Sequence, residues 1–382
     1  MIYVKEVPKT QKGIREFLDL SYRLYRKDHN WVPPLYGTVL RSLLGEHNPL
    51  LCGEHQFFMA YDGEKSVARV LAGVDTRLNE RLGEKRGYIS LFETEENLEY
   101  ARAVLDAAVE YLHGLGMEKV VGPNTPGFND FGKGLLQEGF DGRPVLFNPY
   151  NPPFYNDFLT AYGFVKHRDH FAYWLDLKDF PVDETQRLSE MAQKRFGFRV
   201  ESIDIHKVRH DQLAAQIAQV VSEAFPPNWE LVPPTVQDIV DEMKSLLSFS
   251  ESGLIVMAFA QDRPVGVLVT FPDYNPLLKT NKGRLFPFGW FTMLFGRKTV
   301  RTVRCVMLFV SPDFQNKAVT VALANVAYEN ARKLGYQAIE ASTIDETNLP
   351  SILTTQRLRA RRYRVYRTYE KELGPCQTGE VN

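Results

Sequence analysis

The hydrophobic positions of the chain follow one pattern that occurs twice. In each copy an apolar strand ending in Leu-Phe precedes an Ala-rich helix that closes on Gly, and a second short strand follows. The first copy occupies residues 87–122 and the second residues 305–341. A unit that recurs in nearly the same register across most of a chain indicates a repeat. The pattern therefore predicts two related domains in tandem.

The segments around each copy repeat as well. Residues 55–75 have the pattern of two apolar strands joined by an Asp-Gly turn, and residues 253–274 are their counterpart. Each copy is followed by a helix-like stretch and then by a strand rich in aromatic and basic residues, at 164–177 and 361–373. Each half is therefore predicted to be α+β, with a mixed, largely antiparallel sheet flanked by helices.

The length of the chain agrees with two domains, because single hydrophobic cores stop growing at roughly 250–300 residues and the chain has 382. The apolar pattern is interrupted near residues 179–196 by Pro181 and a polar segment. We expect an N-terminal domain over residues 1–180, a C-terminal domain over 181–375 and a tail over 376–382.

Composition excludes several classes of protein. Basic and acidic residues nearly cancel, 46 against 47, which makes a nucleic-acid partner unlikely on bulk charge. Three scattered cysteines, Cys52, Cys305 and Cys376, do not make a disulfide framework, and the first residues lack a signal-peptide pattern. These features predict a cytoplasmic protein, and nothing in the charge balance excludes an oligomer.

One apolar segment, Leu285 to Gly296, stands out for its aromatic residues. At 12 residues with an internal Pro and Gly it is too short to span a bilayer, so no membrane span is expected. It is predicted to be a packed insertion helix, with a pocket wall or lid for a substrate and an element at a membrane surface as alternatives.

A possible phosphate site follows the second apolar strand. Residues 311–320 supply a turn with small side chains and then the start of an Ala-rich helix. Free backbone N–H groups at a helix N-terminus, helped by the helix dipole, can bind phosphate. A run of six arginines between Arg357 and Arg367 lies close by in sequence and would also suit phosphate, although a solvated edge strand protected by charge explains it as well.

At this point the chain resembles the GNAT superfamily of N-acetyltransferases. The family's acetyl-CoA loop reads Q/R-x-x-G-x-G/A, and residues 315–320 (QNKAVT) keep its first position and replace both glycines. Asn348 matches the Asn that follows the family's next strand. The resemblance implies acetyl-CoA or another acyl-CoA as co-substrate, held by a degenerate loop in the C-terminal domain. The implied cofactor-binding residues are Leu308, Phe309, Val310, Gln315, Asn316, Lys317, Ala318, Val319, Thr320 and Asn348.

The first half fits the same template and includes the family's late Gly-Phe pair at Gly163-Phe164. Its loop position, residues 94–100, carries three glutamates that would repel a pyrophosphate at a helix N-terminus. The N-terminal domain is therefore expected to lack a usable CoA loop. Motifs at 122–129, 134–140 and 151–155 make the whole chain similar to a group of bacterial proteins built from two GNAT-like halves.

In the GNAT reaction an amine attacks a thioester, so the site needs a base and an acid. Glu340 is the candidate base, with Asp345 and Glu346 as alternatives that could act through water, and Tyr363 is the candidate acid. Carboxylates and tyrosines at these positions are also explained as ordinary strand residues without a catalytic role. Four residues from a Gly/Pro-rich part of the first half are predicted to line the acceptor site: Asn124, Asn129, Asp130 and Tyr155.

Histidine adds little to this interpretation. His167 and His170 lie three apart on a probable strand, so they are expected to face opposite sides and not to form a metal pair. No metal is expected, and Cys305 is expected to be a small core residue.

The sequence thus favours an acyl-CoA-dependent N-acyltransferase that moves an acetyl or longer acyl group to a small-molecule or peptide amine. Two alternatives stay open. One is a non-catalytic ligand-binding or scaffold protein with the GNAT-like fold. The other is a Fem-type transferase that takes an aminoacyl group from tRNA.

Overall fold

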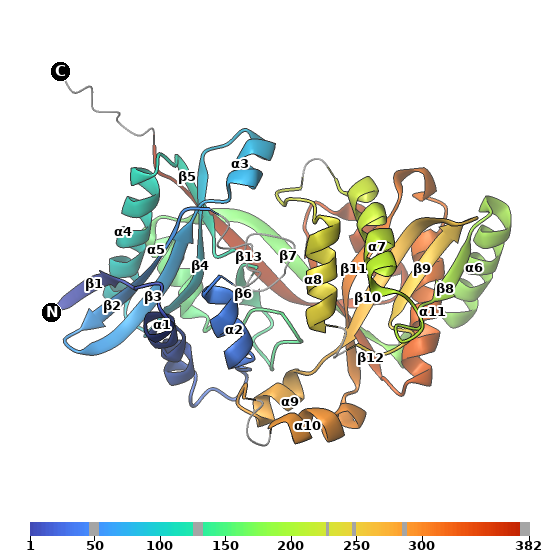
Figure 1. Cartoon of the computed structure of the whole chain (residues 1–382), viewed down its shortest axis with the longest axis horizontal. Helices are drawn as coiled ribbons and strands as arrows, with labels where there is room; N and C mark the ends of the chain where they lie inside the picture. The colour runs from blue at the N-terminus through green and yellow to red at the C-terminus, as the bar shows by residue number, and fades with distance from the viewer. Residues whose placement is uncertain (46–52, 125–132, 227–228, 247–249, 285–288, 375–382) are drawn as a thin grey trace.

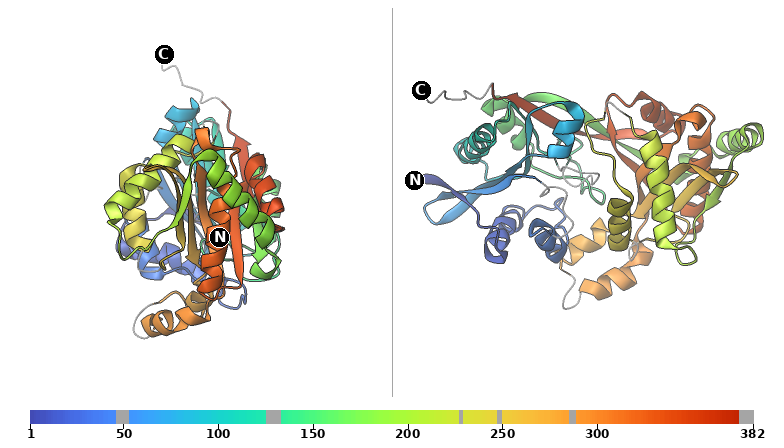
Figure 2. Two further views of the ribbon diagram at one scale, coloured as in Figure 1. Left: turned by 90° about the vertical axis from the view of Figure 1, so that its right-hand side faces the viewer. Right: turned by 45° about the horizontal axis from the view of Figure 1, so that its top comes forward.

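The computed structural model describes residues 1–45, 53–124, 133–226, 229–246, 250–284 and 289–374. Two α+β halves lie side by side and share one sheet, with helices on both of its faces (Figures 1 and 2). The predicted fold class, with a largely antiparallel sheet in each half, is confirmed. In the described part of the chain, no helix combines the length and apolar character needed to cross a membrane.

The first half runs from β1 to β7. Its elements are β1 (Ile2–Glu6), α1 (Gln11–Leu24), α2 (Tyr36–Leu43), β2 (His55–Asp62), β3 (Lys65–Gly73), α3 (Thr76–Leu82), β4 (Arg86–Thr94), α4 (Leu98–Gly114), β5 (Lys119–Gly122), β6 (Leu135–Glu138), α5 (Phe154–Tyr162) and β7 (Val165–Asp176).

The second half runs from α6 to β13. Its elements are α6 (Val182–Phe196), β8 (Arg199–Ser202), α7 (His210–Ala224), α8 (Val236–Leu246), β9 (Ile255–Ala260), β10 (Arg263–Pro272), α9 (Asn275–Thr280), α10 (Gly289–Gly296), β11 (Thr302–Val310), α11 (Val319–Lys333), β12 (Ala338–Asp345), α12 (Leu349–Arg357) and β13 (Arg361–Glu372).

The two halves exchange their last strands. The strand order is β1-β2-β3-β4-β5-β13-β7-β12-β11-β10-β9-β8. Strand β7 of the first half pairs antiparallel with β12 of the second, while β13 of the second half pairs antiparallel with β5 of the first. Between them β7 and β13 pair with each other, so the sheet continues across the molecule.

The expectation of a solvated edge strand at 361–373 is wrong, because β13 lies inside the sheet. Its basic residues reach acceptors within the fold. Arg367 forms two hydrogen bonds with the carboxylate of Asp169, at 2.7 and 3.0 Å, and Arg364 donates to the carbonyl oxygens of Gly142 and Arg143. Charge density along a strand does not by itself show that the strand is exposed.

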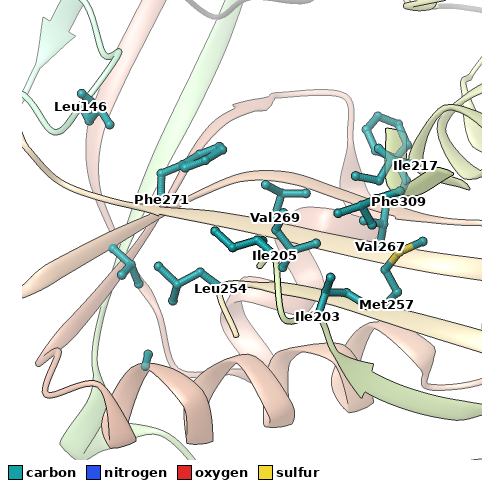
Figure 3. Packing of buried hydrophobic residues seen from close by; sticks show 14 of the residues in the cluster. Leu146, Ile203, Ile205, Ile217, Leu254, Met257, Val267, Val269, Phe271 and Phe309 are labelled. Carbon is teal, nitrogen blue, oxygen red and sulfur yellow. The ribbon is translucent and has the colours of Figure 1, made fainter. Parts of the chain in front are cut away.

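The largest hydrophobic cluster lies between the sheet of the second half and α7. Figure 3 shows Ile217 of α7 with Met257, Val267 and Phe309 of the strands. Alternate residues of the same strands, such as Leu268, pack instead against α11 on the other face. This alternation is what a sheet covered on both faces requires. Each fully buried side chain of this size contributes about 1.5–3 kcal/mol to folding.

Candidate functional site in the second half

The strands β11 and β12 separate partway along their length. They are parallel neighbours from Thr302↔Ala338 to Cys305↔Ala341, and their pairing ends there. Strand β11 continues to Val310 against β10, whereas β12 continues against β7 after a register shift. Beyond Cys305 the backbone of β11 therefore diverges from β12. We call this opening the splay.

A cavity of about 240 Å³ occupies the splay. Its lining includes Ala324 and Ala327 of α11 on one face of the sheet and Trp229 and Leu231, from the segment between α7 and α8, on the other. Residues of β7 and Asn124 of the first half complete it. The cavity thus connects the two faces through the sheet, so a ligand group entering from one side can meet one entering from the other.

Most of the lining of the splay itself is apolar. It includes Cys305, Val306, Met307, Leu308 and Phe309 of β11. Burial raises the pKa of the Cys305 thiol to about 12. Cys305, expected to be a small core residue, is half-buried and lines the cavity.

The predicted phosphate loop leads from β11 into α11. A 3₁₀ turn at Pro312–Phe314 is followed by Asn316 and Ala318, both with positive φ, 60° and 57°. Ala318 is the N-cap of α11, and its side chain makes no capping hydrogen bond. The N–H groups of the first helical turn point out of the helix and receive no side-chain cap from this residue. The loop keeps a left-handed backbone that glycine would adopt without strain.

Of the other predicted cofactor-binding residues, some line the cavity and others lie in or beside the loop. Leu308, Phe309 and Asn348 line the cavity. Val310 ends β11, and its carbonyl oxygen accepts a hydrogen bond from Gln315 Nε2 at 3.2 Å. Asn348 is the N-cap of α12 and accepts from the Ser351 N–H. Lys317 lies over the ring of Phe314, 4.7 Å from its centroid.

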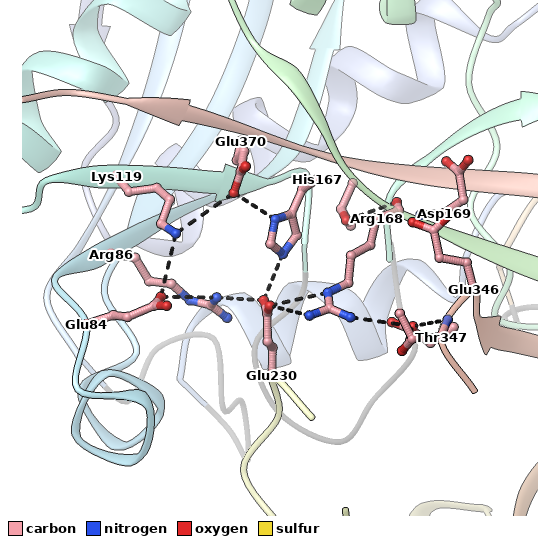
Figure 4. A network of polar contacts seen from close by, with 12 residues as sticks. Glu84, Arg86, Lys119, His167, Arg168, Asp169, Glu230, Glu346, Thr347 and Glu370 are labelled. Atoms are coloured by element: carbon pink, nitrogen blue, oxygen red, sulfur yellow. Dashed lines mark hydrogen bonds and ion pairs between the residues drawn. The ribbon is translucent and has the colours of Figure 1, made fainter. Parts of the chain in front are cut away.

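Figure 4 shows a network of charged side chains, of which His167, Arg168 and Glu230 line the cavity. Glu230 accepts hydrogen bonds from Arg86 at 2.6 Å and Arg168 at 2.9 Å. The His167 ring lies between Glu230 and Glu370, 2.8 Å from a carboxylate oxygen of each. Burial acts to raise the pKa of Glu230, but the bond to His167 and the charge of Arg86 outweigh it and hold that pKa well below its usual value. The network ties the segment after α7 to the first half.

His170 lines the cavity close to the splay and is 3% exposed. Its Nδ1 has no hydrogen-bond partner among the described residues, and it lies 3.8 Å from Oδ2 of Asp345, too far for a hydrogen bond. Burial, together with the charges of Lys133 and Arg168, holds the pKa of His170 well below its usual value. This environment favours the neutral imidazole over the imidazolium.

Glu340 and Tyr363 lie together away from the cavity. Glu340 alternates along β12 with the cavity-lining Ile339 and Ala341, so it points to the opposite face of the sheet. There it is fully buried, 3.7 Å from Arg304, and accepts hydrogen bonds from Asn148 at 3.0 Å and Tyr363 at 3.2 Å. Burial raises the pKa of Glu340. The catalytic roles expected for these two residues stay predictions.

The predicted acceptor residues of the first half are dispersed. Asn124 lines the cavity. Asn129 and Asp130 lie outside the described residues. Tyr155 is 1% exposed inside the first half, where its hydroxyl donates to Glu93 at 2.9 Å and accepts from the Thr94 N–H. Its place is in the core of the first half.

His167 and His170, which were expected to face opposite sides of the strand, both line the cavity. The register between β7 and β13 shifts there: Thr368 pairs with Arg168, but Tyr369 pairs with Lys166. His167 is the extra residue of this irregularity, and such a bulge breaks the alternation of side chains. Neither His170 nor Glu230 was identified as a site residue from sequence. The only sequence signal for His170 was that it lies three residues from His167.

Comparisons with known proteins agree with this geometry. The model of the acetyltransferase (GNAT) family matches residues 215–358, which include the splay and the loop. The chain is 28% identical over 380 residues to a bacterial ceramide synthase of Caulobacter vibrioides, with 96% of each chain covered. It is 27% identical over 373 residues to Protein YghO of Escherichia coli strain K12, covering 95% of this chain and 94% of that protein.

Solved structures are similar in fold over the whole chain. A tandem GNAT protein from the clavulanic acid biosynthesis pathway superposes with a TM-score of 0.58 at 12% identity, covering 98% of this chain and 99% of that one. A GCN5-related N-acetyltransferase from Sphaerobacter thermophilus gives a TM-score of 0.53 at 13% identity, covering 98% and 96%.

Proposed function

We propose that the chain is a GNAT-type acyltransferase, with the family's fold twice in tandem, and that it transfers an acyl group from acyl-CoA to an amine. The splay between β11 and β12 carries this proposal, because it opens a cavity through the sheet beside a helix start suited to phosphate. The C-terminal half holds the CoA in this proposal. Gln315 to Thr320 would face its phosphates, and β11 would face its acyl group.

We further propose a long-chain amine as the acceptor. The relative named as a ceramide synthase covers nearly the full length of the chain, and a ceramide is the amide of a long-chain amino alcohol. The apolar lining of the cavity, from Phe309 and Trp229 to Leu231, suits aliphatic groups better than a charged peptide. An acyl chain longer than acetyl is consistent with the same lining.

The proposed reaction needs from the protein a base and hydrogen-bond donors for the oxyanion. The amine nitrogen forms a bond to the thioester carbonyl carbon while the C–S bond breaks. Backbone N–H groups of β11 between Val306 and Leu308, where the strand has parted from β12, would stabilise the developing oxyanion. We assign the base to Nδ1 of His170, which takes the amine proton, and the departing thiolate takes a proton from water. Asp345, 3.8 Å away, would stabilise the imidazolium that forms.

Isothermal titration with acetyl-CoA and with the more soluble octanoyl-CoA tests the cofactor site. We expect binding by the intact protein and loss of binding in Ala318→Glu, because a carboxylate at the helix start would repel phosphate. Lys333→Glu, at the far end of α11, makes a larger charge change and should bind normally. Release of free CoA in the presence of a long-chain 2-amino alcohol then tests transfer.

The alternatives make different predictions for the same protein. If neither acyl-CoA binds or raises the melting temperature, the acyl-CoA proposal is wrong and a non-catalytic GNAT-like protein is favoured. If tRNA binds with a steep dependence on salt and acyl-CoA does not, the Fem-type reaction is favoured.

A further inference from the structure

Helix α10 presents large apolar side chains to solvent. Trp290, Phe291, Leu294 and Phe295 are 43%, 43%, 56% and 69% exposed. Their spacing along the helix places them in one stripe. We call these four residues the α10 surface. Figures 1 and 2 show α9 and α10 projecting from the edge of the second half.

The helix is held to the body by its other side. Met293 is 7% exposed and belongs to the main hydrophobic cluster together with Leu277 of α9. The rings of the α10 surface stack on one another, with centroids 3.7 Å apart for Trp290 and Phe291 and 6.1 Å for Phe291 and Phe295. The exposed stripe is thus a fixed feature of a packed helix. Contiguous apolar side chains of this kind mark a surface that binds something.

The charged side chains of the segment that carries this helix are all of one sign. No acidic residue occurs between Asp273 and Asp313, although acidic residues slightly outnumber basic ones in the whole chain. The flanks of α10 carry four exposed basic residues: Lys282, Arg284, Lys298 and Arg301. An aromatic stripe flanked by lysine and arginine is the composition of elements that lie in the interface of anionic membranes.

Charge also argues against a second copy as the occupant. In a two-fold contact the same patch meets itself, so the four basic residues of one copy would face those of the other. A bilayer with anionic lipids instead offers negative headgroups to the basic residues and acyl chains to the aromatic rings.

We propose that the α10 surface docks onto a bilayer containing anionic lipids, with Trp290, Phe291, Leu294 and Phe295 at the level of the acyl-chain boundary and the basic residues at the headgroups. The proposal stands apart from acyl transfer, since docking needs neither acyl-CoA nor an acceptor. For residues 290–295 it adopts the membrane-surface alternative given for the apolar segment.

Sedimentation with vesicles of phosphatidylcholine, with and without phosphatidylglycerol, tests the proposal. We expect the intact protein to bind the anionic vesicles at least on the order of 10-fold more tightly than the neutral ones. Trp290→Ser with Phe295→Ser should weaken binding on the order of 100-fold, since two aromatic anchors are lost. The matched control is Met191→Ser in α6 with Leu334→Ser just after α11, two side chains that are 52% and 44% exposed.

Charge variants and a spectroscopic readout complete the test. Lys282→Glu with Lys298→Glu should remove the preference for anionic vesicles, whereas Lys207→Glu, whose side chain is 83% exposed, should not. Tryptophan fluorescence should shift to shorter wavelength on binding, and Trp290→Phe should lose that shift while retaining binding. Inorganic phosphate at millimolar concentration should not compete, which separates a bilayer from a free phosphate as the ligand.

Several results would overturn the proposal. The first is that the intact protein does not bind vesicles. The others are that the α10 and control variants bind equally well, and that neutral and anionic vesicles are bound equally well. A dimer in sedimentation velocity that the α10 variant abolishes would show that a second copy covers this surface. Acyl-CoA titration of the same variants distinguishes the two proposals, because cofactor binding should be unchanged in all of them.

Discussion

His170 combines three properties of a general base in one residue. It lines the cavity, its Nδ1 has no hydrogen-bond partner among the described residues, and burial keeps it neutral. His170→Gln preserves the approximate size of the side chain but not its basicity. We expect kcat to fall by about 10²–10⁴-fold with little change in acyl-CoA binding. Steady-state kinetics and titration measure the two effects separately, and His206→Gln, an exposed substitution, should be silent.

The pH dependence of activity in the unmodified protein separates a catalytic role of His170 from a role in packing. Because burial lowers the pKa of His170 below 6.5, the acid limb of kcat/KM in the unmodified protein should lie below pH 6.5, with no loss of activity on that account at higher pH. External imidazole should partly restore activity to His170→Ala. An acid limb above pH 6.5, or a Gln variant as active as the parent, would remove His170 from the mechanism.

Asp273 gives a test of stability at the residue scale. Its carboxylate accepts hydrogen bonds from the N–H groups of Leu146 and Asn275, yet burial raises its pKa from 3.8 to about 6. The folded state therefore holds this proton more tightly than the unfolded state, so the contribution of Asp273 to stability falls as pH rises from about 4 to about 6. The shift corresponds to roughly 3 kcal/mol.

Asp273→Asn keeps an acceptor for both N–H groups and removes the buried charge. We expect it to be more stable than the parent by about 1–3 kcal/mol at pH 8, with the difference shrinking toward zero near pH 4. Urea unfolding of both proteins across this range measures it. A difference that does not depend on pH would mean that the pKa of Asp273 is the same in the folded and the unfolded protein.

At the scale of elements, the start of α11 is strained at Ala318, because this residue has the left-handed backbone that glycine adopts without strain. Ala318 has φ 57°, a conformation that costs residues with a Cβ roughly 1–2 kcal/mol. Ala318→Gly should raise the free energy of unfolding by about 1 kcal/mol and should not weaken acyl-CoA binding. Ala103→Gly, within α4 where the backbone is helical, should lower it by about the same amount. Equal destabilisation by both changes would contradict the strain at Ala318.

The elements themselves could be predicted from sequence, but their partners could not. Apolar periodicity and turn residues located the paired strands β2–β3 and β9–β10, because these patterns are local. The exchange of β7 and β13 is not local. Both strands carry similar aromatic and basic residues, so neither sequence says whether β5 or β12 is its neighbour.

The candidate site could likewise be predicted only where its residues are close together in sequence. The loop and the end of β11 were predicted because a strand, a turn and a helix start follow one another in sequence. His170 was missed because a bulge at His167 depends on pairing with β13. Glu230 was missed because Arg86, His167 and Arg168, which surround it, are distant in sequence.

At the scale of the whole molecule, the exchanged strands make each half incomplete without the other. Strand β13 comes last in the chain but lies between β5 and β7, with Val365, Tyr366 and Tyr369 at most 3% exposed. The network around Glu230 adds contacts across the same boundary (Figure 4). A chain that ends at residue 360 would expose edges of both halves, and we expect it not to fold, whereas one that ends after Gly374 keeps β13 and should be stable.

Unfolding of the intact chain should therefore be a single event, even though the chain contains two repeats of ordinary domain size. Trp31 reports on the first half and Trp290 on the second. In two variants that each keep one of these tryptophans and replace the other three by Phe, urea should give the same midpoint by fluorescence, coincident with that of circular dichroism. Loss of β13 from the sheet removes the partner of β5 and of β7 at once, so neither half can persist while the other unfolds. Two separate midpoints would show that β5 and the first half keep their structure without the exchanged strand, and the shared sheet would then be a contact between domains that are stable alone.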